Sequence, residues 1–247
     1  MALSRYSEDN FIMKKKKKFL AIIPARSGSK GIKDKNIRSF CGKPLIYYTI
    51  KEAKKSKFLD RIIVSTDSEK YADIAKKYGA EVPFLRPDEL ARDKSLIVDV
   101  VIDLLKNLEI RENYKPDYVV LLQPTSPLRT YMDIDKCIKL ALSKKCDGVM
   151  TMVSTEQLLY TIEKGYLNLL YNKNWLRRTN RQSLPDAYKI NGPAVVLATR
   201  KSILKNKSFL AARIAPVIME KWRSTDLDKE EDFLLAELIY KNKNKLK

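Results

Sequence analysis

Short apolar segments that alternate with amphipathic helical segments are the strongest constraint on how this 247-residue chain folds. Phe19–Pro24 and Tyr118–Leu122 are continuous apolar runs, a pattern typical of strands buried on both faces of a parallel sheet. Helical periodicity follows the first run, from Pro44 to about Lys55. This β-α order with short connections predicts an α/β fold built on a doubly wound, mostly parallel sheet.

The remaining elements are expected in the same alternating order. Further strands are expected at Arg61–Ser65, Glu81–Leu85, Gly148–Val153, Ala194–Thr199 and Ile214–Met219. Further helices are expected between a Ser68 cap and Gly79, from Ser95 to about Leu108, over Met132–Ser143 and over Lys229–Tyr240. Residues 154–188 break the rhythm and predict a β-rich excursion. We therefore expect a flexible basic extension at 1–18, one α/β domain from 19–153 and 189–247, and an inserted element at 154–188.

Composition narrows the chemistry that this chain can perform. It contains no histidine, which excludes imidazole bases, Ser-His-Asp triads and HExxH zinc sites. Its three cysteines lack metal-ligand spacing, and their odd number does not suit a disulfide framework. No apolar run approaches the roughly 20 residues that a membrane span needs. We expect a soluble protein of a reducing cytoplasm, with no membrane partner.

The net charge of +19 raises the question of nucleic-acid binding. Lys14–Lys18 and four lysines of the C-terminal tail carry nine of these charges, which leaves +10 for the rest of the chain. Lysine-rich ends are usually solvated, and no nucleic-acid-binding module accompanies them. We expect no nucleic-acid partner, and the remaining positive charge would suit a cleft that attracts an anionic substrate.

A glycine-containing cationic loop follows the first strand. The segment ARSGSKGIKDKN, residues 25–36, places Gly28 and Gly31 among arginine and lysine residues. Small residues let a backbone approach phosphate oxygens closely, and the cations neutralise the phosphate charge. The segment matches neither GxGxxG nor GxxxxGK[ST]. Phosphate binding is the prediction, and a solvated basic turn is the structural alternative.

Three motifs in order give the sequence a resemblance to a known family. They are IIPARSGSKGIKDKNI, then LLQPTSPLR at 121–129, then RQSLPDAY at 181–188 followed by Asn191–Gly192. Together they resemble the acylneuraminate cytidylyltransferases, whose best-known members are the CMP-sialic acid synthetases. The likeness runs from about Phe19 to Tyr240. It implies a Rossmann-like nucleotidyltransferase fold and the transfer of CMP from CTP to a nonulosonic acid, most simply N-acetylneuraminate.

The resemblance implies a nucleotide site and a magnesium site. The residues implied to bind the nucleotide are Arg26, Gly28, Ser29, Lys30, Lys35, Asn36 and Arg86. Asp226 and Asp228 are implied to hold Mg²⁺ against the triphosphate, and they act in catalysis with Lys30 and Lys35. Two carboxylates at i and i+2 in an extended loop can converge on one hard cation. From the residues alone, Asp228 is equally suited to cap the following helix.

The resemblance also implies a sugar site and a dimer. Gln123, Thr125 and Ser126 would bind the acidic nine-carbon sugar, and Arg181 and Tyr188 would reach it from the neighbouring subunit of a homodimer. Residues 154–188 match the family's dimerisation element. One departure concerns Asn191–Gly192, which is followed by PAVVLATR instead of the usual Ala, bulky apolar residue and Tyr. This leaves open legionaminic acid, pseudaminic acid or another ulosonic acid as the substrate. A non-catalytic basic nucleic-acid-binding protein is the alternative from another class.

Overall fold

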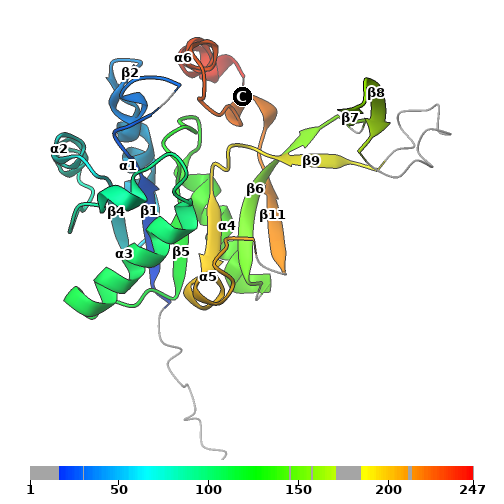
Figure 1. The fold of residues 1–247 in the computed structure, drawn as a ribbon. Helices are drawn as coiled ribbons and strands as arrows, with labels where there is room; N and C mark the ends of the chain where they lie inside the picture. The colour runs from blue at the N-terminus through cyan, green and yellow to red at the C-terminus, as the bar shows by residue number, and fades with distance from the viewer. Residues whose placement is uncertain are drawn as a thin grey trace, which may run out of the picture.

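The computed structural model describes residues 17–29, 31–144, 146–156, 158–170, 185–210 and 213–246, and a seven-stranded mixed sheet forms its centre (Figure 1). The strand path is β11-β6-β10-β5-β1-β4, with β9 added by pairing with β6. The strands are β1 (Phe19–Pro24), β4 (Arg61–Ser65), β5 (Tyr118–Leu121), β6 (Gly148–Thr155), β9 (Ala187–Ile190), β10 (Val196–Thr199) and β11 (Ile214–Ile218). β1 runs parallel to β4 and β5, β11 runs parallel to β6, and β10 runs antiparallel to both of its neighbours. The predicted α/β class is confirmed.

Helices cover both faces of the sheet, which explains why its central strands β1, β5 and β10 are apolar and largely buried. The helices are α1 (Leu45–Lys55), α2 (Glu69–Lys77), α3 (Ile97–Glu112), α4 (Tyr131–Lys144), α5 (Arg200–Asn206) and α6 (Glu230–Asn242). Ala21 and Ile23 of β1 pack with α1, α2 and α4, whereas Leu20 and Ile22 pack with α3 and α5. Alternate side chains of a strand face opposite ways, so each face of β1 meets its own helical layer.

A third apolar cluster joins the two ends of the chain. The cluster contains Ile32 of the first loop and Leu45 of α1. It also contains Leu227, which precedes α6, and Phe233 of α6. Phe40 lies between them, in the short hairpin formed by β2 (Ser39–Phe40) and β3 (Lys43–Pro44). This cluster fixes the cationic loop after β1 beside the segment that precedes α6.

The expected strand at Glu81–Leu85 is wrong. Only Glu81 makes a bridge, to Ile63 of β4, and the chain then leaves the sheet. Pro83 has no N–H to donate, so a longer ladder would lack a hydrogen bond at its centre. The start predicted for the next helix is also displaced, since α3 begins at Ile97 and not at Ser95.

The end of β6 and the paired strand β9 form an arm that projects from the sheet. The end of β6 pairs antiparallel with β9, with Thr155 opposite Ala187, and carries the hairpin of β7 (Tyr160–Glu163) and β8 (Tyr166–Leu169). Figure 1 shows this arm standing away from the helical layers. Its apolar side chains are exposed, Ile162 and Tyr166 by about three quarters. In the described parts of the chain, no helix has the length and apolar character to cross a bilayer.

Two side chains of α3 allow a matched test of this packing. Leu108 is fully buried, whereas Ile110 is 81% exposed. Leu108→Ala should lower the free energy of unfolding by about 2–5 kcal/mol, because it leaves a cavity under the sheet. Ile110→Ala should change it by less than about 0.5 kcal/mol. Urea unfolding followed by circular dichroism measures both, and equal effects would contradict the layer assignment.

Candidate functional site

A cavity of about 520 Å³ opens at the carboxyl ends of β1, β4 and β5. In an open α/β sheet this is where ligands bind. The loop after β1, the segment between β4 and α3, the turn after β5 and the segment before α6 all contribute to its walls. The charged and polar lining residues are Arg26, Ser29, Lys35, Asn36, Arg86, Arg92, Asp93, Ser95, Gln123, Thr125 and Asp228.

Arg26 crosses the mouth of the cavity. Its guanidinium donates to the Ala91 carbonyl oxygen at 3.1 Å and to Asp93 Oδ1 at 2.8 Å. The buried amide of Asn36 donates to the Arg26 carbonyl oxygen at 3.1 Å, which ties the two ends of the loop together. Asn36 therefore shapes the loop, and Arg26 joins it to the opposite wall.

Arg86 is buried at the end of β4. Its Nη2 donates to the Ser65 carbonyl oxygen at 2.7 Å and its Nε donates to Ser65 Oγ at 3.1 Å. Burial lowers the pKa of this guanidinium to about 10. At neutral pH it remains a cation inside the wall of the cavity, with no carboxylate bonded to it among the described residues. An anionic ligand would supply the missing charge.

The acidic segment before α6 lies against the cationic loop. Leu227 is fully buried, Asp228 next to it is exposed, and the Asp226 side chain is partly buried against Gly192. Lys35 donates from its Nζ to the Leu227 carbonyl oxygen at 2.8 Å and to Asp228 Oδ1 at 3.0 Å. A Cβ on Gly31 would come within 2.9 Å of the Asp228 carbonyl oxygen. Only glycine allows this approach.

Asp226 carries an incompletely satisfied buried oxygen. Its Oδ1 is shielded from solvent and has no hydrogen-bond partner in the portion of the chain that the structure describes. Burial raises the pKa of the Asp226 carboxyl, and the neighbouring Asp228 raises it further, while the Thr125 hydroxyl and Lys35 oppose the shift. Gly192 adopts a φ of +88° beside it, and a Cβ there would lie 2.6 Å from Asp226 Cγ.

The capping role considered for Asp228 is wrong. The N-cap of α6 is Lys229, and the side chain of Asp232 accepts from the backbone N–H groups of Asp228 and Lys229 at 2.9 and 2.7 Å. Asp232 thus satisfies the start of the helix from within its first turn. The carboxylate of Asp228 is left exposed at the rim of the cavity.

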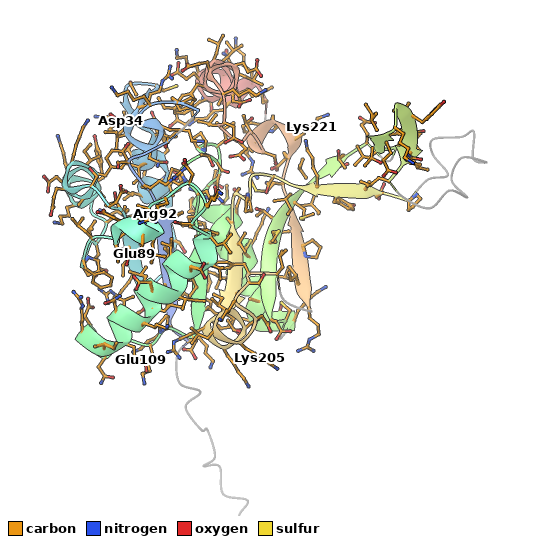
Figure 2. All side chains as sticks on the ribbon, viewed as in Figure 1. Asp34, Glu89, Arg92, Glu109, Lys205 and Lys221 are labelled. Carbon is orange, nitrogen blue, oxygen red and sulfur yellow. The ribbon has the colours of Figure 1, made fainter. Side chains whose placement is uncertain are left out.

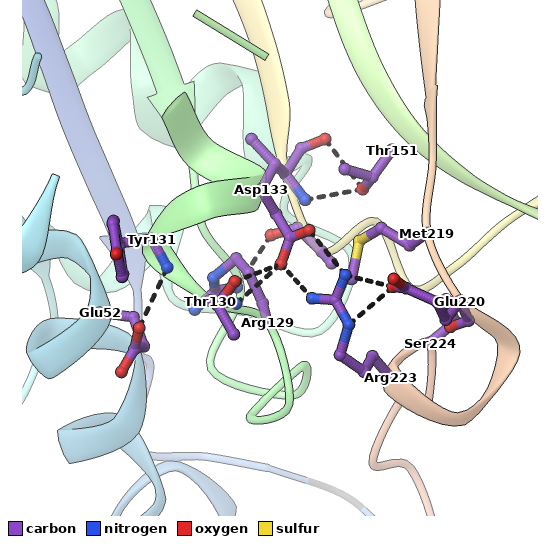
Figure 3. Close-up of polar contacts among 12 residues, drawn as sticks. Glu52, Arg129, Thr130, Tyr131, Asp133, Thr151, Met219, Glu220, Arg223 and Ser224 are labelled. Atoms are coloured by element: carbon purple, nitrogen blue, oxygen red, sulfur yellow. Dashed lines mark hydrogen bonds and ion pairs between the residues drawn. The ribbon is translucent and has the colours of Figure 1, made fainter. Parts of the chain in front are cut away.

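The buried side chain of Arg129, which is labelled in Figure 3, holds the turn after β5 in place. Arg129 Nη1 donates to the Gln123 carbonyl oxygen at 3.1 Å and to the Ala194 carbonyl oxygen at 2.8 Å, and Nη2 donates to Thr49 Oγ1 at 2.7 Å. One side chain thereby connects the Gln123 turn to the segment that carries Gly192. Displacement of Arg129 would move both walls of the site.

A second ion-pair network lies beside Arg129. Arg223 makes a bidentate contact with Asp133 and a further contact with Glu220. Asp133 also accepts from the backbone N–H and the hydroxyl of Thr130. These contacts keep the pKa of the Asp133 carboxyl below its ordinary value although burial raises it. Figure 3 shows that the network joins the start of α4 to the turn before the acidic segment.

Several residues predicted for the site do not line the cavity. Gly28 has no atom within 4 Å of a Cβ built on it, and Ser126 is fully buried with its hydroxyl unpaired among the described residues. Tyr188 lies on β9 in the projecting arm and is 43% exposed. Asp226 lies directly behind the wall, next to Thr125 and Gly192. Lys30 and Arg181 lie outside the described residues.

Sequence reasoning missed Arg92 and Asp93. Both line the cavity, from the segment that leads into α3 (Arg92 is labelled in Figure 2). The signal was weak, because RPDELARDKS follows no strand and has no glycine-rich or paired-carboxylate pattern. Only the fold brings this segment opposite Arg26.

The aspartate pair fits a magnesium ion that is completed by other ligands. Among the described residues no group of three or more His, Cys, Asp or Glu side chains could hold a metal ion. Mg²⁺ in proteins is often held by one or two carboxylates, with water and phosphate oxygens in the remaining positions. The orphaned Oδ1 of Asp226 and the exposed carboxylate of Asp228 match that donor set.

Several known proteins resemble this chain in sequence. The profile of a family described as Cytidylyltransferase matches residues 20–246. An N-acylneuraminate cytidylyltransferase of Escherichia coli is 37% identical over 233 residues, which are 93% of this chain but 54% of the relative, so the chain spans about half the length of that protein. A CMP-N,N'-diacetyllegionaminic acid synthase of Legionella pneumophila is 36% identical, over 90% of this chain and 96% of the relative.

A solved structure shares the fold. A CMP:2-keto-3-deoxy-manno-octonic acid synthetase, solved in complex with CTP, superposes with a TM-score of 0.68 at 13% identity. The match covers 92% of this chain and 99% of that one. At this level of identity the likeness concerns the fold alone.

Two glycines of positive φ allow a test of the packing around Asp226. Gly42 has a φ of +83° with open space around it, whereas Gly192 also faces Asp226. Gly42→Ala should lower the free energy of unfolding by about 1–2 kcal/mol, from backbone strain alone. Gly192→Ala should lower it by about 1–3 kcal/mol more, because the new methyl group must displace the aspartate. Urea unfolding gives both values, and equal losses would contradict the close approach.

The raised pKa of Asp226 predicts how its replacement changes stability with pH. The folded state favours the protonated carboxyl, so its contribution to stability is present below the unfolded pKa of about 3.9 and is lost as pH rises through the folded value. Asp226→Asn removes the buried charge. It should therefore unfold at higher urea concentration than the unsubstituted protein at pH 7, by a margin that narrows toward pH 4.

Asp228→Asn is the matched control for this measurement. It removes an exposed carboxylate that pairs with Lys35 and should not raise stability. Urea midpoints at pH 4, 5, 6 and 7 decide the question. A stability of Asp226→Asn below that of the unsubstituted protein at pH 7 would show that the carboxylate is well satisfied in the fold.

Proposed function

Because this chain belongs to the cytidylyltransferase family, we propose that it transfers CMP from CTP to the anomeric hydroxyl of a nonulosonic acid and releases pyrophosphate. N-acetylneuraminate is the first substrate to consider, since the relative from Escherichia coli is named for that class of acid. A second candidate is a legionaminic-type acid, and the observation that favours it is the relative from Legionella, which this chain matches over nearly its full length.

The observation that carries this proposal is one cavity bordered by both signs of charge. Arg26, Arg86, Arg92 and Lys35 line it together with the carboxylates of Asp93 and Asp228. A triphosphate needs several cations, and a divalent ion bound to it needs carboxylates. One cation and one carboxylate of this lining are in direct contact, since Lys35 Nζ lies 3.0 Å from Asp228 Oδ1.

The chain's own residues bind and orient the nucleotide in this proposal. Lys35 and Lys30 neutralise the negative charge that develops on the leaving pyrophosphate, and Arg26 exchanges its contact with Asp93 for the phosphates. Asp226 and Asp228 would hold Mg²⁺, which supplies charge neutralisation of the triphosphate and a lower pKa for a nearby hydroxyl. Positioning and electrostatics suffice for phosphoryl transfer, so the lack of histidine is no obstacle.

The sugar is proposed to lie over the turn after β5. Gln123 and Thr125 line the cavity there, and Arg129 fixes the backbone of that turn. Arg181 and Tyr188 would reach the sugar carboxylate from a second copy of the chain. The exposed apolar arm supports a homodimer, because large exposed apolar patches mark interaction surfaces.

The setting of the reaction follows from its substrates and from the thiols. CTP is an intracellular nucleotide, and Cys41, Cys137 and Cys146 form no disulfide. We therefore place the enzyme in the cytoplasm. We also propose that the chain has no nucleic-acid partner, and RNA or DNA binding that weakens steeply with salt would contradict this.

Pyrophosphate release from CTP and Mg²⁺ tests the proposal against a panel of acids. The panel comprises N-acetylneuraminate, a legionaminic acid, a pseudaminic acid and the eight-carbon 2-keto-3-deoxy-manno-octonate. One nine-carbon acid should support release at least about tenfold faster per active site than the others, as expected for a site that reads substrate hydroxyl and amide groups. No release with any of the four acids would refute the assignment.

Asp226→Asn serves as the mechanistic variant in the same assay. Its turnover should fall by about 10²-fold or more, because the metal loses a ligand and the phosphates lose their anchor. Asp73→Asn, an exposed position on α2, should keep full turnover. Near-normal turnover of Asp226→Asn with magnesium as the only metal would remove Asp226 from the metal site.

A further inference from the structure

A second cavity, of about 340 Å³, lies on the other side of the turn after β5. Its walls come from α1, the start of α4, the turn at 220–223 and the end of α6. No described residue lines both this cavity and the candidate active-site cavity. Its volume is at the lower end of the range of small-molecule sites, about 300–1,000 Å³.

Cations outnumber carboxylates around this second cavity. The basic lining residues are Lys51, Lys55, Arg129, Lys136, Arg223 and Lys243, and the acidic ones are Glu52, Asp133 and Glu220. All three carboxylates already have partners, since Glu52 pairs with Lys55, and Asp133 and Glu220 pair with Arg223. Lys51, Lys136 and Lys243 have no carboxylate partner among the residues that the structure describes. A concave site with this charge excess attracts an anion.

The buried arginine supplies a second, independent observation. Arg129 lines this cavity, is only 2% exposed, and its Nε has no hydrogen-bond partner in the described part of the chain. Its other two nitrogens bond neutral oxygens of Gln123, Ala194 and Thr49. Burial lowers the pKa of this guanidinium to about 10, whereas the carboxylates of Asp133 and Glu52 in the same lining raise it. The unused Nε donor favours a further hydrogen-bond acceptor beside it.

Rings and apolar side chains form the remaining wall. Tyr131, Trp222 and Tyr240 line the cavity together with Pro127 and Leu128. Lys243 lies 3.8 Å from the centre of the Tyr240 ring. A ligand for this site therefore carries a charged group for the lysines and a flat or apolar part for the rings.

We propose that this cavity is a second binding site, for a small organic phosphate of the nucleoside monophosphate class. The phosphate lies among Lys51, Lys136 and Lys243, and the base lies against the rings. The turn after β5 separates the two cavities, with Gln123–Thr125 facing the active-site cavity and Pro127–Thr130 facing the second one. Arg129 belongs to the second side of that turn and donates to the Gln123 carbonyl oxygen of the first, so it connects the walls of the two cavities.

Equilibrium dialysis with radiolabelled CMP tests the proposal through the number of sites per chain. The double variant Lys51→Gln with Lys136→Gln should lose one CMP site, or weaken it by about tenfold or more, because two charge-assisted contacts disappear. Lys54→Gln with Lys139→Gln changes the net charge equally on the same two helices but outside the cavity. That control variant should bind CMP like the unsubstituted protein.

The measured quantity is the difference in the number of CMP sites between the unsubstituted protein and the Lys51/Lys136 variant. This difference does not depend on whether CMP also enters the active-site cavity. If the proposed reaction is wrong, the unsubstituted protein shows one site, and the Lys51/Lys136 variant still loses it. Equal numbers and affinities of CMP sites in the unsubstituted protein and the Lys51/Lys136 variant would overturn the second site. Binding seen only above millimolar CMP would overturn it as well. AMP, dialysed in parallel, shows whether the base is read.

Discussion

The contact between the cationic loop after β1 and the acidic segment before α6 is the constraint on which the site depends. The two segments lie about 190 residues apart in sequence, and Lys35 joins them through the Leu227 carbonyl oxygen and the Asp228 carboxylate. Beneath that contact Ile32, Leu227 and Phe233 form one apolar cluster. Because Leu227 is buried in this cluster, it fixes the position of the backbone between Asp226 and Asp228. Apolar packing therefore sets the electrostatics of the cavity.

Apolar packing around the site, more than hydrogen bonds within it, stabilises the site. Among the described residues, Arg129 is buried with hydrogen bonds to neutral groups only, Arg86 is buried without a bonded carboxylate, and Asp226 has an unpaired oxygen. Each of these groups loses hydration that the protein does not fully replace. Such arrangements are typical of functional sites, where a ligand completes what the fold leaves open. The helical layers on both faces of the sheet supply the compensating apolar burial.

The position of Gly192 illustrates how backbone and site are linked. Its positive φ and its closeness to Asp226 mean that no side chain fits there without moving the carboxylate. Gly31 has the same relation to the backbone of Asp228. In both places the missing side chain of glycine lets the segment that carries the aspartates pack closely against another part of the chain. For Gly31 the sequence had suggested approach to a phosphate.

The sequence by itself determined the α/β class, most strands and helices, the cationic loop and the acidic pair, because local periodicity records which faces are buried. It did not reveal that Pro83 ends the third expected strand, nor that Asp232, and not Asp228, satisfies the start of α6. The tertiary structure alone brought Arg92 and Asp93 opposite Arg26 and left Asp226 Oδ1 without a partner within the described ranges. These features depend on contacts between residues far apart in the chain, and such contacts are fixed by packing and not by local pattern.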